Sequence, residues 1–180
     1  MNKFLLIFLI PLFLAKKSTD KVIARQGKVS FFSYTAIENI KAQNNQVLSI
    51  VDLNKGEIAV SMLMNAFIFE KEVMREHFND SYVESDLFPK ATFEGKIADF
   101  NPDLNTQTRI ISGNFTMHGV SKNLDIKAKI EKTSDNSYSI FGTFEAQVND
   151  YNIKIPALLR GNIAKTILVD FKFEYNSYGK

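Results

Sequence analysis

Apolar and polar residues alternate along TILVDFKFEY, the segment over residues 166–175. The apolar side chains on one face are Ile167, Val169, Phe171, Phe173 and Tyr175, and charged or polar residues lie between most of them. A period of two places successive side chains on opposite faces of an extended chain. The segment is therefore predicted to be an antiparallel β-strand with one face buried and the other in water.

The same alternation recurs along most of the chain and predicts strands at 28–35, 46–53, 56–64, 91–100, 109–118, 123–132 and 137–146. Residues rich in Asn, Asp, Pro and Ser separate several of these segments and favour turns. One stretch differs, because the apolar residues of EKEVMREHF have near-helical spacing, which predicts a short helix over about 71–79. About eight strands without βαβ alternation indicate a closed barrel or a sandwich.

Three glycines, Gly95, Gly113 and Gly142, fall in mid-strand on the faces predicted to point inward. Glycine at such positions marks sharp bending of a strand or the close approach of another group. An eight-stranded barrel is just wide enough either to be filled by side chains or to hold one small ligand. A filled interior and a ligand-holding interior both fit the sequence.

The aromatic residues are skewed, with 16 Phe, 6 Tyr and no Trp. Phe and Met on inward faces make a deformable apolar wall that suits a chain-like ligand, and the same residues also suit a filled core. The net charge of +2 gives no indication of nucleic acid as a partner.

Residues that would indicate catalysis or metal binding are sparse. There is no cysteine, and the two histidines, His77 and His118, lie far apart in the sequence without a metal-ligand spacing. The alternation places His118 on the more polar, outer face at a hairpin turn, where we expect it to form local hydrogen bonds. The acidic pairs Glu70/Glu72 and Glu84/Asp86 fit a solvated surface. No catalytic residue, metal site or cofactor is predicted.

The N-terminal segment begins with Lys3, continues as an apolar run from Phe4 to Ala15, and becomes polar at Lys16. This order is typical of a secretory signal peptide over residues 1–15, whose end falls between Ala15 and residue 20. The run is shorter than the about 20 residues of a membrane-spanning helix, so no stable span is expected in the mature protein. We therefore expect a periplasmic or secreted protein, with an uncleaved N-terminal anchor as the alternative.

Three motifs resemble the YceI-like, polyisoprenoid-binding family and occur in the family's order. They are DLFPKATF (86–93), GNFTMHGVSK (113–122) and DYNI (150–153), the last followed by Pro156. The resemblance extends over about residues 28–175, and the second motif is the most specific. It implies one domain over residues 21–180 with a lipocalin-like antiparallel β-barrel of about eight strands and one short helix.

The family resemblance implies a binding protein, not an enzyme, that holds an isoprenoid or quinone-like lipid in an apolar lumen. The residues expected to contact this ligand are Phe67, Phe69, Phe78, Tyr82, Phe93, Phe115, Met117, Phe144, Tyr151 and Phe171. Tyr82 and Tyr151 are expected near the mouth, where their hydroxyls would meet a headgroup. The alternatives are a lipid- or quinone-modifying enzyme that uses His118 or His77, and a structural or stress-related barrel without a ligand. The sequence also leaves open a homodimer.

Overall fold

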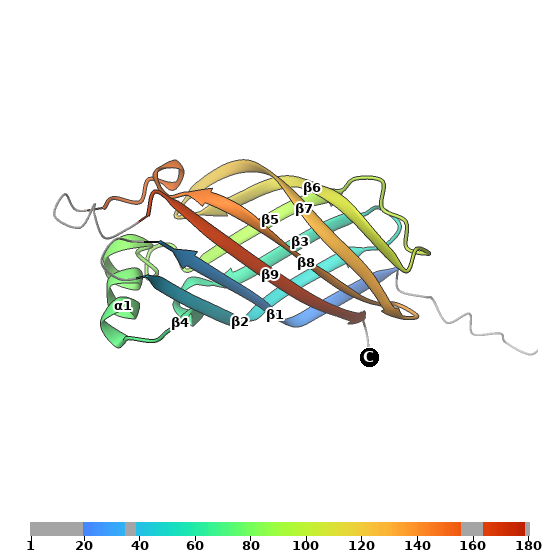
Figure 1. The fold of residues 1–180 in the computed structure, drawn as a ribbon, viewed down its shortest axis with the longest axis horizontal. Helices are drawn as coiled ribbons and strands as arrows, with labels where there is room; N and C mark the ends of the chain where they lie inside the picture. Colours follow the sequence, from blue (N-terminus) through green and yellow to red (C-terminus); the bar gives the residue numbers. More distant parts are fainter. Residues whose placement is uncertain (1–19, 35–38, 156–163, 179–180) are drawn as a thin grey trace, which may run out of the picture.

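The computed structural model describes residues 20–34, 39–155 and 164–178, and it shows a closed antiparallel β-barrel (Figure 1). Eight long strands follow one another around the barrel in the order β1-β9-β8-β7-β6-β5-β3-β2, and the pairing of β2 with β1 closes it. A two-residue strand, β4, adds to β2. The strands are β1 (Lys21–Ser33), β2 (Ile40–Asp52), β3 (Glu57–Leu63), β4 (Ile68–Phe69), β5 (Lys90–Ile97), β6 (Thr106–Met117), β7 (Val120–Ser134), β8 (Ser137–Gln147) and β9 (Thr166–Ser177). The predicted fold class is confirmed.

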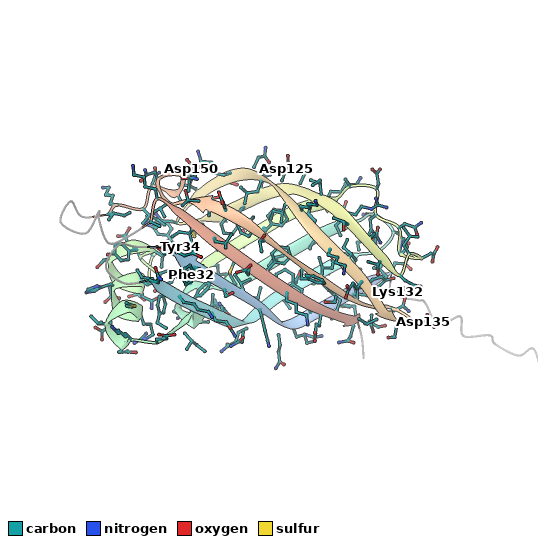
Figure 2. The ribbon with its side chains drawn as sticks, in the orientation of Figure 1. Phe32, Tyr34, Asp125, Lys132, Asp135 and Asp150 are labelled. Atoms are coloured by element: carbon teal, nitrogen blue, oxygen red, sulfur yellow. The ribbon has the colours of Figure 1, made fainter. Side chains whose placement is uncertain are left out.

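Helical segments gather at one end of the barrel, which we call the α1 end (Figure 1). They are α1 (Glu72–Glu76), the π-helical η2 (His77–Tyr82) that directly continues it, and the 3-10 turns η1 (Met64–Ala66) and η3 (Val148–Tyr151). The turn between β7 and β8 lies at the opposite end, which we call the far end. Figure 2 shows Phe32 and Tyr34 toward the α1 end and Lys132 and Asp135 at the far end.

The alternation predicted from the sequence matches the faces of the strands. On β9, Phe171, Phe173 and Tyr175 are buried, while their neighbours Lys172 and Glu174 are exposed. The same holds for β5, β6, β7 and β8, whose inward residues are buried or half-buried. Each strand therefore contributes one apolar face to a shared interior.

Two strands begin much earlier than the alternation indicated. β1 begins at Lys21, seven residues before the predicted start at 28, because a bulge at Gly27 shifts the register and breaks the alternation. β2 begins at Ile40 instead of 46, although its first part is mostly polar. The predicted signal peptide over 1–15 lies outside the described residues.

The far half of the barrel interior is filled by phenylalanine rings that lie against glycines. A Cβ on Gly113 would lie 2.8 Å from the ring of Phe93, and a Cβ on Gly27 would lie 2.5 Å from the ring of Phe173. These glycines leave the space that the rings occupy. The mid-strand glycines therefore mark close approach both of rings and of neighbouring backbone, and this part of the lumen is packed.

Candidate functional site

The α1 end of the barrel holds a cavity of about 380 Å³ that is partly open to solvent. Its wall comes from inward residues of β1, β3, β6 and β9 and from the segments that cover this end, including β4, α1, η2 and η3. The volume lies in the range of roughly 300–1,000 Å³ that is usual for small-ligand pockets. The barrel interior is therefore packed in one half and hollow in the other, so each of the two predicted kinds of interior is present in one half.

Four phenylalanines join the covering helix to the barrel. Phe78 of η2 has its ring centroid 5.6 Å from those of both Phe31 and Phe67, and 5.1 Å from that of Phe69. Most of these contacts are tilted or edge-on, the arrangements that aromatic pairs prefer. The N–H of Val83 donates to the carbonyl of Phe78 at 2.9 Å, and this i→i+5 bond keeps Phe78, Tyr82 and Val83 on the cavity wall.

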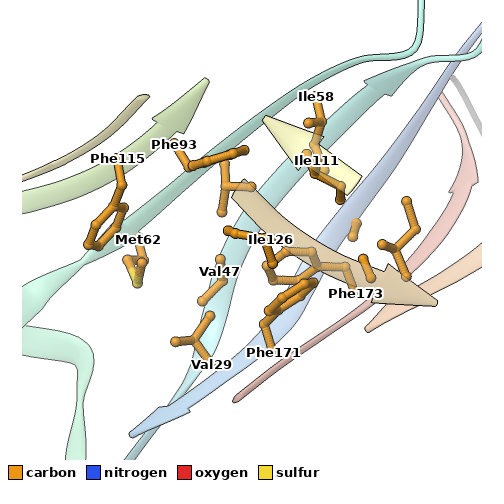
Figure 3. Close-up of a cluster of buried hydrophobic side chains, with 14 of the residues drawn as sticks. Val29, Val47, Ile58, Met62, Phe93, Ile111, Phe115, Ile126, Phe171 and Phe173 are labelled. Atoms are coloured by element: carbon orange, nitrogen blue, oxygen red, sulfur yellow. The ribbon is translucent and has the colours of Figure 1, made fainter. Parts of the chain in front are cut away.

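The inner limit of the cavity is formed by Val29, Met62, Phe115 and Val169, which we call the floor. These four side chains also line a second void of about 40 Å³ on the far side. Figure 3 shows Val29, Met62 and Phe115 in the buried cluster of apolar side chains. The floor therefore separates the hollow half of the lumen from the packed half.

The polar groups on the cavity wall are few and mostly neutral. Among the described lining residues they are Ser33, His77, Tyr82 and Tyr151, and there is no Lys, Arg, Asp or Glu. Burial raises the pKa of the Tyr82 phenol, and burial together with the Asp150 carboxylate raises that of Tyr151. Both phenols are therefore neutral hydrogen-bonding groups at neutral pH.

The ten residues expected to contact a ligand fall into two groups. The larger cavity is lined by Phe67, Phe69, Phe78, Tyr82, Phe115, Met117 and Tyr151. Phe93, Phe144 and Phe171 instead line the 40 Å³ void beyond the floor. Strand alternation identifies an inward side chain, but it does not say how far along the barrel axis that side chain lies.

Several cavity residues were not selected from the sequence. Phe31 and Ser33 belong to β1 and share its inward face with Val29, so alternation along the predicted strand at 28–35 was a usable signal. Ile153 and Ile155 follow η3 in a segment without regular structure. No periodic pattern identifies residues of that kind.

His118 lies at the turn between β6 and β7, as predicted, but its environment differs from the prediction. His118 and Gly119 have φ values of 51° and 73°, so the turn has positive φ at both central residues, as type I′ hairpins do. Because the backbone of His118 is left-handed and not extended, the alternation of faces along β6 no longer fixes the direction of its side chain. The expectation of local hydrogen bonds was wrong, because the partners of His118 are distant in sequence and its side chain is only 9% exposed.

Both ring nitrogens of His118 contact other segments of the α1 end. Nδ1 lies 2.9 Å from the carbonyl oxygen of Tyr151 in η3, and Nε2 lies 2.8 Å from Oε2 of Glu84, just after η2. The Phe88 ring packs on the imidazole with centroids 4.4 Å apart. His118 does not line the cavity. It holds the cover of the cavity together and is not placed to act on a bound molecule.

His77 does line the cavity, on η2, and it is exposed. Within the described ranges, no group of three or more His, Asp or Glu residues is placed to hold a metal ion. The two histidines therefore have different positions, one at the cavity wall and the other in the contacts behind it.

A closed antiparallel barrel with an apolar internal cavity at one end defines a lipocalin-like class of protein. Within that class, the chain belongs to the family of YceI-like domains, whose model matches residues 21–175. A search of curated proteins found no match.

Solved structures with the same fold include three bacterial proteins. A polyisoprenoid binding domain from Saccharophagus degradans, implicated in plant cell wall breakdown, superposes with a TM-score of 0.76 at 16% identity, over 89% of this chain and 99% of that one. BcnA from Burkholderia cenocepacia gives 0.70 at 15% identity, over 82% and 95% of the two chains. A YceI protein from Campylobacter jejuni gives 0.65 at 16% identity, over 81% and 89%.

In the part of the chain that the structure describes, no helix has the length and apolar character needed to cross a membrane.

Proposed function

We propose that this protein binds one isoprenoid or quinone-like lipid in the cavity at the α1 end and carries or sequesters it unchanged. The observation that carries this proposal is the cavity of about 380 Å³ whose described wall is almost entirely apolar. Burial of apolar surface stabilises a complex by roughly 25 cal/mol per Å², so an apolar chain gains affinity there without polar contacts. The polyisoprenoid binding domain of the same fold supports the choice of ligand.

The charge of the wall favours a ligand with a neutral headgroup. A charged group taken out of water without a partner is strongly disfavoured, and the described lining residues include no Lys or Arg to pair with a phosphate or carboxylate. The hydroxyls of Ser33, Tyr82 and Tyr151 suit a carbonyl or an alcohol instead.

Organic extraction of the purified protein, followed by mass spectrometry, tests the proposal directly. We expect one neutral prenyl lipid per chain, and we expect the delipidated protein to take up geranylgeraniol or a short-chain ubiquinone at one equivalent. Repeated recovery of empty protein that takes up neither compound would overturn the proposal.

A binding role, as opposed to catalysis, is proposed because His77 is the only described His, Lys, Arg, Asp or Glu residue on the cavity wall. General acid–base chemistry usually needs a second, positioned group. Incubation of the protein with a bound quinone or prenyl alcohol should return the compound unchanged, and His77→Gln should retain binding. Conversion of the compound that disappears in His77→Gln would favour the lipid-modifying enzyme.

Export to the periplasm or the medium is also proposed, on the basis of the charged start and apolar run of residues 1–15. Cell fractionation of the full chain beside a variant without residues 2–15 tests it. We expect only the full chain to leave the cytoplasm, and retention of both forms there would contradict export. Dimer formation stays a prediction, to be measured by sedimentation.

A further inference from the structure

The floor divides the lumen of the barrel into two parts. Its members come from four strands, with Val29 on β1, Met62 on β3, Phe115 on β6 and Val169 on β9. In the order around the barrel, β1 and β9 are adjacent, whereas β6 and β3 lie on other parts of the wall. The four side chains therefore reach toward the axis from different sides.

We propose that this floor sets the length of the bound lipid chain, with Met62 as the residue that determines how deep the chain reaches. The proposal rests on the proposed lipid-binding function and adds a limit on the ligand. A chain that enters from the α1 end can extend as far as the floor. Any further isoprene units remain outside the apolar cavity and add no burial.

Packing contacts hold most of the floor in place. Phe115 is 6% exposed, and its ring centroid lies 5.9 Å from that of Phe144 and 5.6 Å from that of Tyr151. Val29 pairs with Phe171 across the sheet, and Phe171 lies in ring contact with Phe173 at 5.3 Å. Displacement of Phe115 or Val29 would therefore disturb the packed far half.

Met62 can be shortened without loss of the ring contacts that hold Phe115 in place. Its unbranched side chain is of the kind that fills irregular gaps in cores, and it separates the cavity from the apolar void of about 40 Å³. We expect truncation to alanine to join the two spaces. Met64 provides a matched control, because it is also a buried methionine on the cavity wall but does not border the void.

The test compares Met62→Ala and Met64→Ala with the delipidated wild-type protein. Binding of farnesol, geranylgeraniol and solanesol, with three, four and nine isoprene units, is measured in one fixed detergent concentration. The ratio of variant to wild-type affinity at each length cancels the partition of the alcohol into detergent. In the wild type, we expect affinity to rise with length and then stop rising before solanesol.

For Met62→Ala, the ratio of variant to wild-type affinity should be larger for solanesol than for farnesol by about tenfold or more. The reason is that each additional buried CH₂ is worth roughly fourfold in affinity. In Met64→Ala, the ratio should be the same at every length. Thermal unfolding establishes that each variant is folded, and Met62→Val serves as a smaller truncation if the alanine variant is not.

Two results would overturn the length limit and leave lipid binding intact. One is a wild-type affinity that keeps rising through nine isoprene units, and the other is a ratio for Met62→Ala that is as independent of length as that for Met64→Ala. Failure of the wild type to bind any of the alcohols or a short-chain quinone would instead overturn the lipid-binding function itself, and the length limit with it.

Discussion

His118 connects three parts of the α1 end that are separated in sequence. One ring nitrogen faces the Tyr151 carbonyl, the other faces the Glu84 carboxylate, and Phe88 covers the ring. Each ring nitrogen therefore lies within hydrogen-bond distance of an oxygen from a different segment. Through these contacts, the turn between β6 and β7 fixes the positions of η2 and η3 on either side of the cavity.

Replacement of His118 by asparagine should destabilise the protein by about 1–3 kcal/mol, because a buried polar partner is left unsatisfied. Asparagine accepts the left-handed backbone of this turn, so the change removes the ring without straining the chain. Urea unfolding measures the loss. His77→Gln is the control and should stay within about 0.5 kcal/mol, as surface substitutions usually do. Equal stability of the two variants would contradict the role assigned to His118.

A second residue-scale prediction concerns pH and Tyr175, which is buried in the far half. The Ser49 hydroxyl donates a hydrogen bond to the Ala59 carbonyl at 3.0 Å. The Tyr175 hydroxyl is therefore the donor in its 2.7 Å hydrogen bond with Ser49. Burial is the main cause that raises the pKa of Tyr175. The stabilisation is complete below the unfolded-state pKa of about 10 and declines above it, because only the unfolded chain ionises.

The free energy of unfolding should therefore fall between about pH 10 and 12, by up to about 1.4 kcal/mol per pH unit from this one group. In Tyr175→Phe this contribution is absent, so the decline should be shallower. Urea unfolding of both proteins from pH 7 to 12 measures the difference. Parallel pH profiles would show that Tyr175 does not couple folding to pH.

At the residue scale, the strand face on which a side chain lies can be predicted from sequence more reliably than the groups that surround that side chain. Phe93 and Phe115 were both correctly placed inward, but one lies beyond the floor and the other forms it. The difference depends on the tilt and register of paired strands, which no local pattern contains. The hydrogen-bond partners of His118 were not predicted, because alternation applies to extended backbone and ends at the positive φ of the turn.

At the element scale, the ring of Phe78 joins the helical cover to the barrel through three aromatic contacts. Phe78 is the η2 residue that meets Phe31 of β1 and Phe69 of β4, so it holds the helix against the barrel. The far half of the barrel does not share these contacts. The cover can therefore weaken while the packed half remains intact.

Phe78→Ala should reduce the affinity for geranylgeraniol by tenfold or more, because it removes cavity wall and loosens the cover. The global unfolding free energy should fall by less than the about 3–5 kcal/mol typical of a core Phe→Ala change, since Phe78 is only half-buried. Titration of the delipidated protein and urea unfolding measure the two effects. Phe32→Ala is the control, since Phe32 is half-buried and does not line the cavity. Unchanged affinity in Phe78→Ala would exclude η2 from the binding site.

The elements themselves were predictable where side chains alternate, and less so where other interactions form the strand. The first part of β2 is an example, because Asn44 is fully buried there and its side-chain N–H donates to the Leu63 carbonyl at 2.8 Å. The Asn44 side-chain oxygen also accepts from the N–H of Gln46 at 2.8 Å. A buried asparagine that bridges two strands has the sequence signature of a turn, so this region was not assigned to a strand.

At the scale of the whole molecule, the barrel divides its stability and its capacity for a ligand between two halves. The far half is packed by aromatic rings against glycines, whereas the α1 half keeps an apolar space of about 380 Å³. An empty apolar cavity lacks the contacts that its lining could make, which disfavours the unliganded state. A ligand that fills this space should therefore stabilise the whole fold.

Saturation with a neutral prenyl lipid should raise the unfolding temperature of the delipidated protein. A ligand at a free concentration 100 times its Kd adds about 2.7 kcal/mol to the native state. For a chain of this size, that corresponds to a rise of roughly 5–10 °C. Differential scanning calorimetry with geranylgeraniol measures the shift, and Phe78→Ala should show a smaller one at the same lipid concentration. An unchanged unfolding temperature at saturation would mean that the cavity does not hold the lipid in the native state.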